Sequence, residues 1–231
     1  MGCTPMGEKG VRRTSNPATP EAGPGMTTVT GADQAGGGAL LDPTTRSTIG
    51  TYGHAIKANA GRYGVDWRLV LAIMKAESGF SPEAESHKGA RGLMQLMPVT
   101  GGEVAEKLGI ENLHAPVDNI HGGTYYLREL YDLFEGAPET DRLRLALAAY
   151  NSGIARVYDA QKLAAYFHDD PRSWQAVKVA MPLLSKRYYT LHRNVWDGGR
   201  PPAGWFGNSK ETIAYVDNVM EYYDEFRLLL N

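Results

Sequence analysis

The stretch that decides the fold runs from Asp66 to Pro98 and reads DWRLVLAIMKAESGFSPEAESHKGARGLMQLMP. Its first part has the apolar spacing of a helix and ends on a carboxylate, Glu77. A loop rich in Gly, Ser and Pro follows, and then a second apolar run that contains one amide, Gln95. An acid at the end of an apolar helix, facing a small polar cluster, is a plausible place for proton-transfer chemistry.

Glu77 is the residue of this stretch that carries most weight. Asp66 is a suitable N-cap for a helix that runs to about Ser78, and Leu69, Ile73 and Glu77 share one face of it. Desolvation on that face and the negative end of the helix dipole would both raise the pKa of Glu77, which suits a general acid. The alternative is a surface glutamate at a helix end, which is the more common fate of an arbitrary Glu.

Composition restricts the class of protein. The chain has 231 residues, of which 42% are hydrophobic, and this suffices for one good-sized domain, alone or with a tail. The formal net charge of −2 argues against a nucleic-acid binder and gives no sign of binding to an anionic membrane. No apolar run approaches the length of a membrane-spanning helix.

The apolar pattern separates a tail from a helical domain. Residues 1–44 are rich in Gly, Pro, Thr and Ser and bury too little surface to fold, so we expect a disordered tail or tether there and the folded domain over 45–231. The pattern predicts helices over 48–63, 66–78, 99–108, 117–134, 141–150, 154–166, 173–180 and 212–230. The fold should therefore be mainly α, although Gly198-Gly199 and Pro201-Pro202 allow a short hairpin between Tyr188 and Phe206.

Four motifs, taken in order, identify a family. They are Glu77-Ser78 with Phe80 and the run from Ser86 to Pro98, then Asn119-x-x-Gly122-Gly123, then Ala148-Ala149-Tyr150-Asn151-Ser152-Gly153, and last Glu211-Thr212-x-x-Tyr215-Val216. Together they closely resemble the soluble-lytic-transglycosylase family, over roughly Thr48 to Tyr223. The segment after Gly153 is similar to the catalytic domain of the membrane-bound type F lytic transglycosylases, but residues 193–210 depart from that pattern.

The resemblance implies a lysozyme-like helical domain of the goose type and an enzyme that cleaves peptidoglycan. In that family one glutamate first protonates the glycosidic oxygen between N-acetylmuramic acid and N-acetylglucosamine, and then activates the sugar's own 6-hydroxyl. The product is 1,6-anhydro-N-acetylmuramic acid, and no water is consumed. Glu77 matches that glutamate, whereas Glu83 and Glu85 lie in a polar loop as solvated residues, so that no second carboxylate is evident.

The same resemblance implies which residues surround the substrate. They are Ser78, Ser86, Gln95, Met97, Tyr150, Asn151, Glu211 and Tyr215. Tyr150 would lie close to Glu77 and help set its protonation, and Tyr215 would line the floor of the cleft. Asn151 would bind sugar or cap a turn, and Glu211 would bind substrate or complement the dipole of the last helix.

Three functions remain in competition: a lytic transglycosylase, a lysozyme-like hydrolase that uses water, and a catalytically silent peptidoglycan-binding module. The intact Glu77-Ser78 argues against the silent module, and the lack of a second carboxylate argues against the hydrolase. The histidines do not cluster at metal-ligand spacing, so we expect no metal and no cofactor.

The expected partner is the peptidoglycan strand, with no nucleic acid and no spanning membrane segment, and the expected state is a monomer. The expected location is the bacterial cell envelope, periplasmic or attached to the outer membrane. No apolar secretion signal precedes Cys3. That single cysteine is either a free thiol in a tail or a lipid-anchored residue, and the sequence leaves both open.

Overall fold

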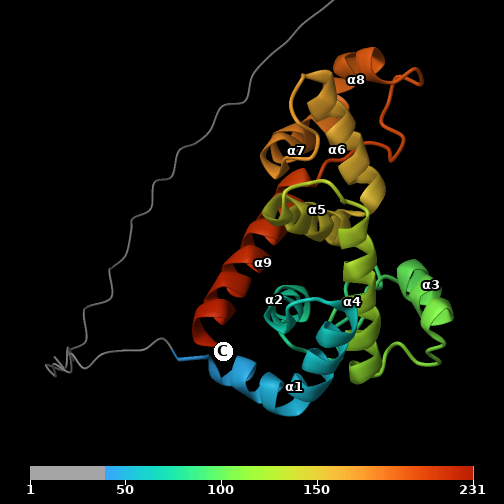
Figure 1. The fold of residues 1–231 in the computed structure, drawn as a ribbon. Coiled ribbons are helices and arrows are strands. Elements are labelled where there is room, and N and C mark those ends of the chain that lie inside the picture. Colours follow the sequence, from blue (N-terminus) through green and yellow to red (C-terminus); the bar gives the residue numbers. More distant parts are fainter. Residues whose placement is uncertain (1–39, 231) are drawn as a thin grey trace, which may run out of the picture. The chain divides into compact units, whose positions relative to one another are not determined.

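The computed structural model describes residues 40–230, and over this range the chain folds into helices joined by loops and two short 3-10 segments (Figure 1). Their bounds are α1 Pro43–Tyr63, α2 Trp67–Ser78, α3 Pro98–Leu108, α4 Pro116–Asp132, α5 Glu139–Ser152, α6 Ile154–Tyr166, α7 Trp174–Ala180, η1 Met181–Leu184, η2 Lys186–Tyr188, α8 Tyr189–Val195 and α9 Ser209–Leu229. The mainly α fold is confirmed. Cys3 and most of the predicted tail lie outside the described residues.

Helix α1 begins earlier than the predicted Thr48. The Asp42 carboxylate accepts a hydrogen bond from the backbone N–H of Thr45 at 2.9 Å, and Pro43 occupies the first turn. An N-cap acid followed by proline is a strong start signal, and it lies within the segment expected to be a tail. The helix ends where Gly64 adopts a φ of 63°, which a glycine reaches without strain.

Helix α2 is the buried centre of the domain. Residues 69 to 74 are all buried, so the helix is covered on every side over this stretch, and it packs against α1 and α9. Fully burying one such apolar side chain stabilises the fold by about 1.5–3 kcal/mol. The last turn stops at Gly79, whose φ is 57° and whose N–H returns to the carbonyls of Met74 and Lys75. Packing of this kind fixes where Glu77 stands.

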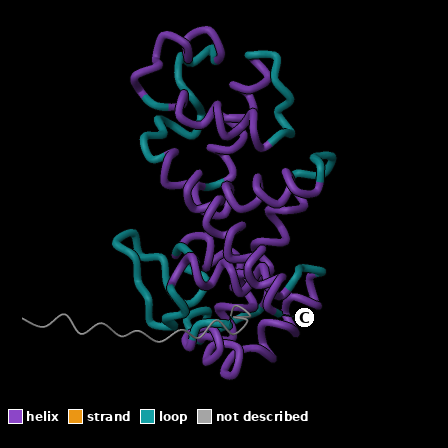
Figure 2. The backbone as a smooth tube through the Cα atoms, turned by 90° about the vertical axis from the view of Figure 1, so that its left-hand side faces the viewer, coloured by secondary structure: helices purple, strands orange, loops and turns teal. Residues whose placement is uncertain are grey.

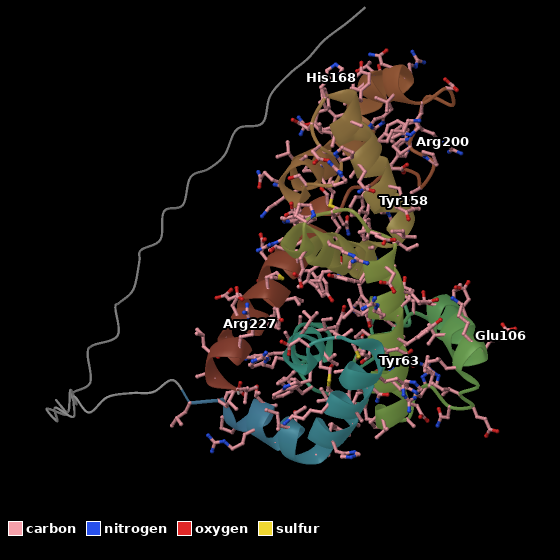
Figure 3. All side chains as sticks on the ribbon, in the orientation of Figure 1. Tyr63, Glu106, Tyr158, His168, Arg200 and Arg227 are labelled. Atoms are coloured by element: carbon pink, nitrogen blue, oxygen red, sulfur yellow. The ribbon has the colours of Figure 1, made fainter. Side chains whose placement is uncertain are left out.

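Helices α4 and α5 connect the two ends of the domain. Helix α4 packs along α1 and meets α5, which in turn contacts α6 and α9 (Figure 1). Figure 3 shows Tyr63 at the end of α1, where its hydroxyl lies 2.6 Å from His121 Nε2 of α4. None of the helices between residues 40 and 230 is long and apolar enough to cross a bilayer.

The short hairpin that the sequence allowed between Tyr188 and Phe206 does not form. Figure 2 shows no strand in the described chain, and this segment consists of α8 and an irregular loop. The reason is local packing: the ring of His192 is fully buried and its Nε2 lies 2.7 Å from the Leu183 carbonyl. Trp196 and Trp205 flank that ring at centroid distances of 5.6 and 5.1 Å. The glycines and prolines of this segment therefore form a loop around the aromatic cluster and not the turn of a β-hairpin.

Candidate active site

Glu77 occupies the last turn of α2, where its carboxyl is desolvated although the residue as a whole is partly exposed. Burial raises the pKa of Glu77 to about 7, and the approach of the Tyr215 hydroxyl offsets only part of that rise. A carboxyl with this pKa is about half protonated near neutral pH. It can therefore give up a proton in one step and accept one in the next.

Two tyrosines from different helices meet at Glu77. Tyr150 comes from the end of α5, and its hydroxyl donates to the Met94 carbonyl at 2.8 Å. Tyr215 comes from α9, and its buried hydroxyl approaches the Glu77 carboxyl, although within residues 40–230 it makes no hydrogen bond of regular geometry. Burial, and then the charge of Glu77, raise the pKa of both phenols well above the ordinary value. Both hydroxyls stay protonated and can serve as donors.

The loop after α2 is held together by its own polar side chains. The Ser78 hydroxyl contacts the carbonyls of Met74 at 3.0 Å and Leu93 at 2.9 Å, which ties the end of α2 to the loop. Ser86 Oγ accepts the Ala90 N–H at 2.9 Å. Gln95 donates to the carbonyls of Ala84 and Gly92 at 2.9 and 3.0 Å. These residues shape the wall of the site, and Met97 beside them is 40% exposed.

Asn151 and Glu211 lie at the junction of α5 and α9. Asn151 Oδ1 accepts the Thr212 hydroxyl at 2.8 Å, which joins the end of α5 to the start of α9. Glu211 is exposed and accepts a hydrogen bond from Asn208 Nδ2 at 3.1 Å, in the first turn of α9. The structure therefore brings Tyr215 to the Glu77 carboxyl and places Tyr150 close enough for the charge of Glu77 to raise its pKa. It gives Asn151 and Glu211 contacts that hold the start of α9.

The nearby acids of the loop stay in solvent, as predicted. Glu83 and Glu85 are exposed, and Glu85 pairs with Arg91 at 3.0 Å. They line a cavity of about 310 Å³ together with Pro82, Ala84, Gly92 and His114. No carboxylate within residues 40–230 contributes to the pKa of Glu77. In the same range, no group of three or more His, Cys, Asp or Glu residues is placed to hold a metal ion.

A cavity of about 430 Å³ lies away from Glu77. It opens at the other end of α2, beside Asp66, and its floor includes the apolar side chains of Leu69, Leu127, Leu143 and Met220. The two ends of this helix are about 16 Å apart at 1.5 Å per residue. Charged side chains at the rim of this cavity are paired with neighbours, as Arg128 is with Asp132 at 2.7 Å. We therefore do not assign the catalytic site to this cavity.

Asn119 belongs to the second family motif but was not predicted as a site residue, and the structure places it at the back of the loop. It is only 1% exposed, and all its side-chain hydrogen bonds go to backbone groups of the surrounding segments. The signal was present in the sequence, because a polar amide on an apolar helix face needs buried partners. What the sequence could not show is which backbone groups those partners are.

Comparison with known proteins agrees with these features. The family model described as "Transglycosylase SLT domain" matches residues 54–173, a range that contains Glu77 and Tyr150 but not Tyr215. A membrane-bound lytic murein transglycosylase F from Desulfosudis oleivorans is 37% identical over 171 residues, which cover 73% of this chain and 35% of that protein. The chain thus spans about a third of the length of the curated relatives it matches.

Two solved structures are similar over most of the domain. One is an inactive Glu-to-Gln mutant of the lytic transglycosylase Slt from Pseudomonas aeruginosa, with a TM-score of 0.54, 27% identity, and coverage of 77% of this chain and 25% of that one. The other is a 70-kDa soluble lytic transglycosylase in complex with bulgecin A, with a TM-score of 0.53, 25% identity, and coverage of 80% and 25%. The expected lysozyme-like fold is confirmed by these neighbours.

Proposed function

Because the chain belongs to the transglycosylase SLT domain family, we propose that it is a lytic transglycosylase that cleaves peptidoglycan with Glu77 as its single acid and base. The bond cleaved is the β-1,4 linkage between N-acetylmuramic acid and N-acetylglucosamine. The observation that carries this proposal is the raised pKa of Glu77, at about 7, beside two protonated phenols. The inactive Slt mutant, in which a glutamate became a glutamine, supports a glutamate in this role.

The proposed reaction has two proton transfers through one carboxyl. Protonated Glu77 gives its proton to the glycosidic oxygen as the bond to C1 of N-acetylmuramic acid breaks, and an oxocarbenium-like centre develops at C1. The Glu77 carboxylate then takes the proton of the 6-hydroxyl, whose oxygen bonds to C1. The product is 1,6-anhydro-N-acetylmuramic acid, Glu77 is protonated again, and no water enters.

The surrounding residues support this cycle. The buried Tyr215 hydroxyl approaches Glu77 without a hydrogen bond of regular geometry in the described chain, and we assign it as a donor to the Glu77 carboxylate or to the sugar above it. Gln95, Ser86 and Met97 form the wall along which the glycan lies, with Ser78 fixing that wall to α2. Asn151 and Glu211 extend the binding surface at the start of α9.

The proposed place of action is the bacterial cell envelope, where peptidoglycan is found. Relatives described as membrane-bound support attachment to a membrane, periplasmic or at the outer membrane. We propose a monomer in which Cys3 is either a free thiol or a lipid-anchored residue.

The experiment that tests the function is mass spectrometry of the fragments released from purified sacculi. Anhydro-muropeptides are expected. Fragments heavier by one water, with reducing ends, would contradict the lyase and establish a hydrolase. Wall binding without any release would establish a silent binding module. Bulgecin A provides a separate binding test: it should shift the NMR signals of Glu77 and Tyr150 and leave those of Asp66 unchanged.

A further inference from the structure

Asn119 on α4 binds three backbone groups at once. Its Oδ1 accepts the Met94 N–H at 2.8 Å, and its Nδ2 donates to the carbonyls of Arg91 at 3.1 Å and Leu113 at 3.2 Å. Three of the four hydrogen bonds that an amide side chain can make are directed at the backbone of the loop and of the chain before α4. A buried amide with three such bonds fixes its partners more tightly than apolar packing does.

The loop backbone fits closely around this amide. Gly92 has a φ of 81°, and a Cβ added to it would lie 2.6 Å from Asn119 Cγ. Such a contact is far inside van der Waals distance, so only glycine permits it. The close approach of Gly92 and the three hydrogen bonds of Asn119 are two aspects of one clamp on residues 91–94.

The clamped residues lead directly to the candidate active site. The carbonyl of Met94, whose N–H is held by Asn119, accepts the hydroxyl of Tyr150 at 2.8 Å. The carbonyl of Leu93 accepts the hydroxyl of Ser78, the neighbour of Glu77 in α2. Residues 91–94 are thus held from α2, α4 and α5, and Asn119 supplies the contact from α4.

We propose that Asn119 is a positioning residue, which holds the Met94 carbonyl in place so that it takes the Tyr150 hydroxyl and keeps that hydroxyl from donating to Glu77. The inference deepens the proposed function, because it assumes that Glu77 is the acid whose protonation matters. If the clamp is released, the Tyr150 hydroxyl turns to the Glu77 carboxylate. A hydrogen bond to the ionised form lowers a pKa, so Glu77 becomes a poorer acid.

The groups that face this pair come from each neighbouring helix. Tyr215 of α9 interacts with Glu77, and Tyr126 of α4 packs on Tyr150 at a centroid distance of 5.4 Å. The cation of α2, Lys75, is paired with Asp42 at 3.3 Å and Glu225 at 3.8 Å. The phenols are neutral at neutral pH, and Lys75, which is paired with two acids, is not among the causes of the Glu77 pKa, so the expected shift is not hidden by a neighbouring charge.

The test is an NMR titration of the Glu77 carboxyl carbon in the full chain. Asn119→Ala should lower the pKa of Glu77 by about one unit, because one hydrogen bond to the carboxylate is gained. In Asn119→Ala/Tyr150→Phe the shift should disappear, since the donor is gone. A role of Asn119 in stability alone would move neither value. An unchanged pKa in folded Asn119→Ala, or a shift that persists in the double variant, would overturn the proposal.

Two further variants keep the test decisive. Asn59→Ala is the matched control, because Asn59 is also a buried helical amide but bonds only to the Ala55 carbonyl of its own helix; it should leave the titration unchanged. Where Asn119→Ala does not fold, Gly92→Ala displaces the same amide and should lower the pKa in the same direction; no shift would contradict the clamp. The titration does not depend on activity. A chain that releases nothing from sacculi would therefore disprove the proposed function, while its titration would still show whether Asn119 controls the pKa of Glu77.

Discussion

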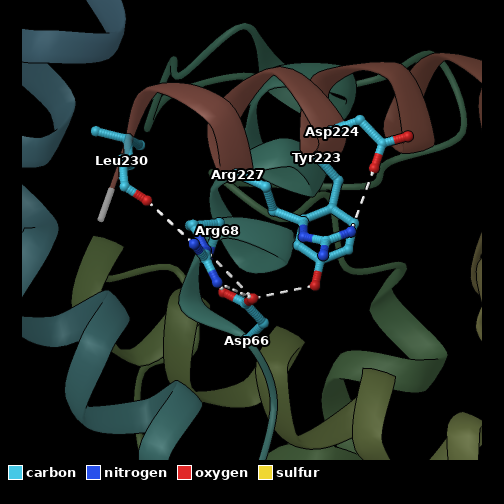
Figure 4. A network of polar contacts seen from close by, with 6 residues as sticks. All are labelled: Asp66, Arg68, Tyr223, Asp224, Arg227 and Leu230. Atoms are coloured by element: carbon cyan, nitrogen blue, oxygen red, sulfur yellow. Dashed lines mark hydrogen bonds and ion pairs between the residues drawn. The ribbon is translucent and has the colours of Figure 1, made fainter.

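Helix α2 carries a carboxylate at each end, and the surroundings shift the pKa values of the two in opposite directions. Desolvation acts against the charge of Asp66, but it is outweighed by hydrogen bonds from Arg68, from the Arg68 backbone N–H and from the Tyr223 hydroxyl, so the pKa of Asp66 is lowered (Figure 4). Arg68 also donates to the Leu230 carbonyl at 3.1 Å, which ties the end of the chain to this cap. This end of the helix is built to keep a charge.

The other end is built to lose one. Glu77 lies at the negative end of the helix dipole, it is desolvated, and no cation among residues 40–230 stabilises its charge. Its ionised form costs free energy in the folded state, and this cost is what makes it a useful acid near neutral pH. Burial alone does not decide the pKa of these carboxyls, because both residues are partly buried and their hydrogen-bond partners decide the direction of the shift.

The largest expected effect comes from removing the acid. Glu77→Gln keeps the size of the side chain but cannot transfer a proton, so release from sacculi should fall by roughly 10³-fold or more. Circular dichroism should show an unchanged helical spectrum. The matched controls are Glu83→Gln and Glu85→Gln. These two acids lie in the loop that follows α2, and their variants should retain activity. A Glu77→Gln variant that cleaves at the wild-type rate would remove Glu77 from the mechanism.

The same substitution should stabilise the fold at high pH. The folded pKa of about 7 exceeds the ordinary 4.5, so the wild type loses stability as the pH rises from about 4.5 to 7. With allowance for solvent screening, the penalty above pH 7 is on the order of 2 kcal/mol. Denaturant unfolding should therefore show Glu77→Gln more stable than wild type at pH 8 and equal at pH 4. If the free energies of unfolding of variant and wild type differed by the same amount at pH 4 and pH 8, the ionisation of Glu77 would not be the cause of the difference.

At the opposite end of α2 the ionised carboxylate stabilises the fold instead of destabilising it. Asp66→Ala removes the N-cap and the acceptor of Tyr223, and should lower the free energy of unfolding by about 1–2 kcal/mol. Because the pKa of Asp66 is lowered, its stabilising effect is present above pH 3.8 and is lost as the pH falls further. Cleavage by the folded variant should be unaffected.

Asp66→Asn is the control for this prediction, since Asn is also a good N-cap and should cost less than Ala. If Asp66→Ala abolished cleavage while the protein stayed folded, the separation of the two ends would be wrong. If it changed neither stability nor activity, the network in Figure 4 would contribute nothing to the fold.

The sequence predicted most of the helices because their periodicity and caps are local signals. Helix α6 was predicted with its observed bounds, and Asp66 and Gly79 mark the ends of α2. The segment 189–208 was misjudged because its conformation depends on the burial of His192 between two tryptophans, which no local pattern reveals. Glycines and prolines there were compatible with a hairpin and with the loop that forms.

The residues at the catalytic carboxyl were predictable from the sequence, whereas the contacts of the surrounding residues were not. Glu77 followed from an acid on an apolar face, and Tyr150 and Tyr215 were expected near it from the family motifs. The clamp of Asn119 was not predicted, because two of its three hydrogen bonds join it to backbone groups 25 and 28 positions away. The partners of Asn151 and Glu211 likewise depend on how α5 meets α9.

An NMR titration of the Glu77 and Asp66 carboxyl carbons in a single wild-type sample compares the two ends of α2 under the same conditions. We expect Glu77 to titrate near pH 7 and Asp66 below pH 3.8. The activity on sacculi should change along the Glu77 titration and not along that of Asp66. A Glu77 carboxyl that titrates at or below 4.5 would be ionised throughout the neutral range and could not act as the acid.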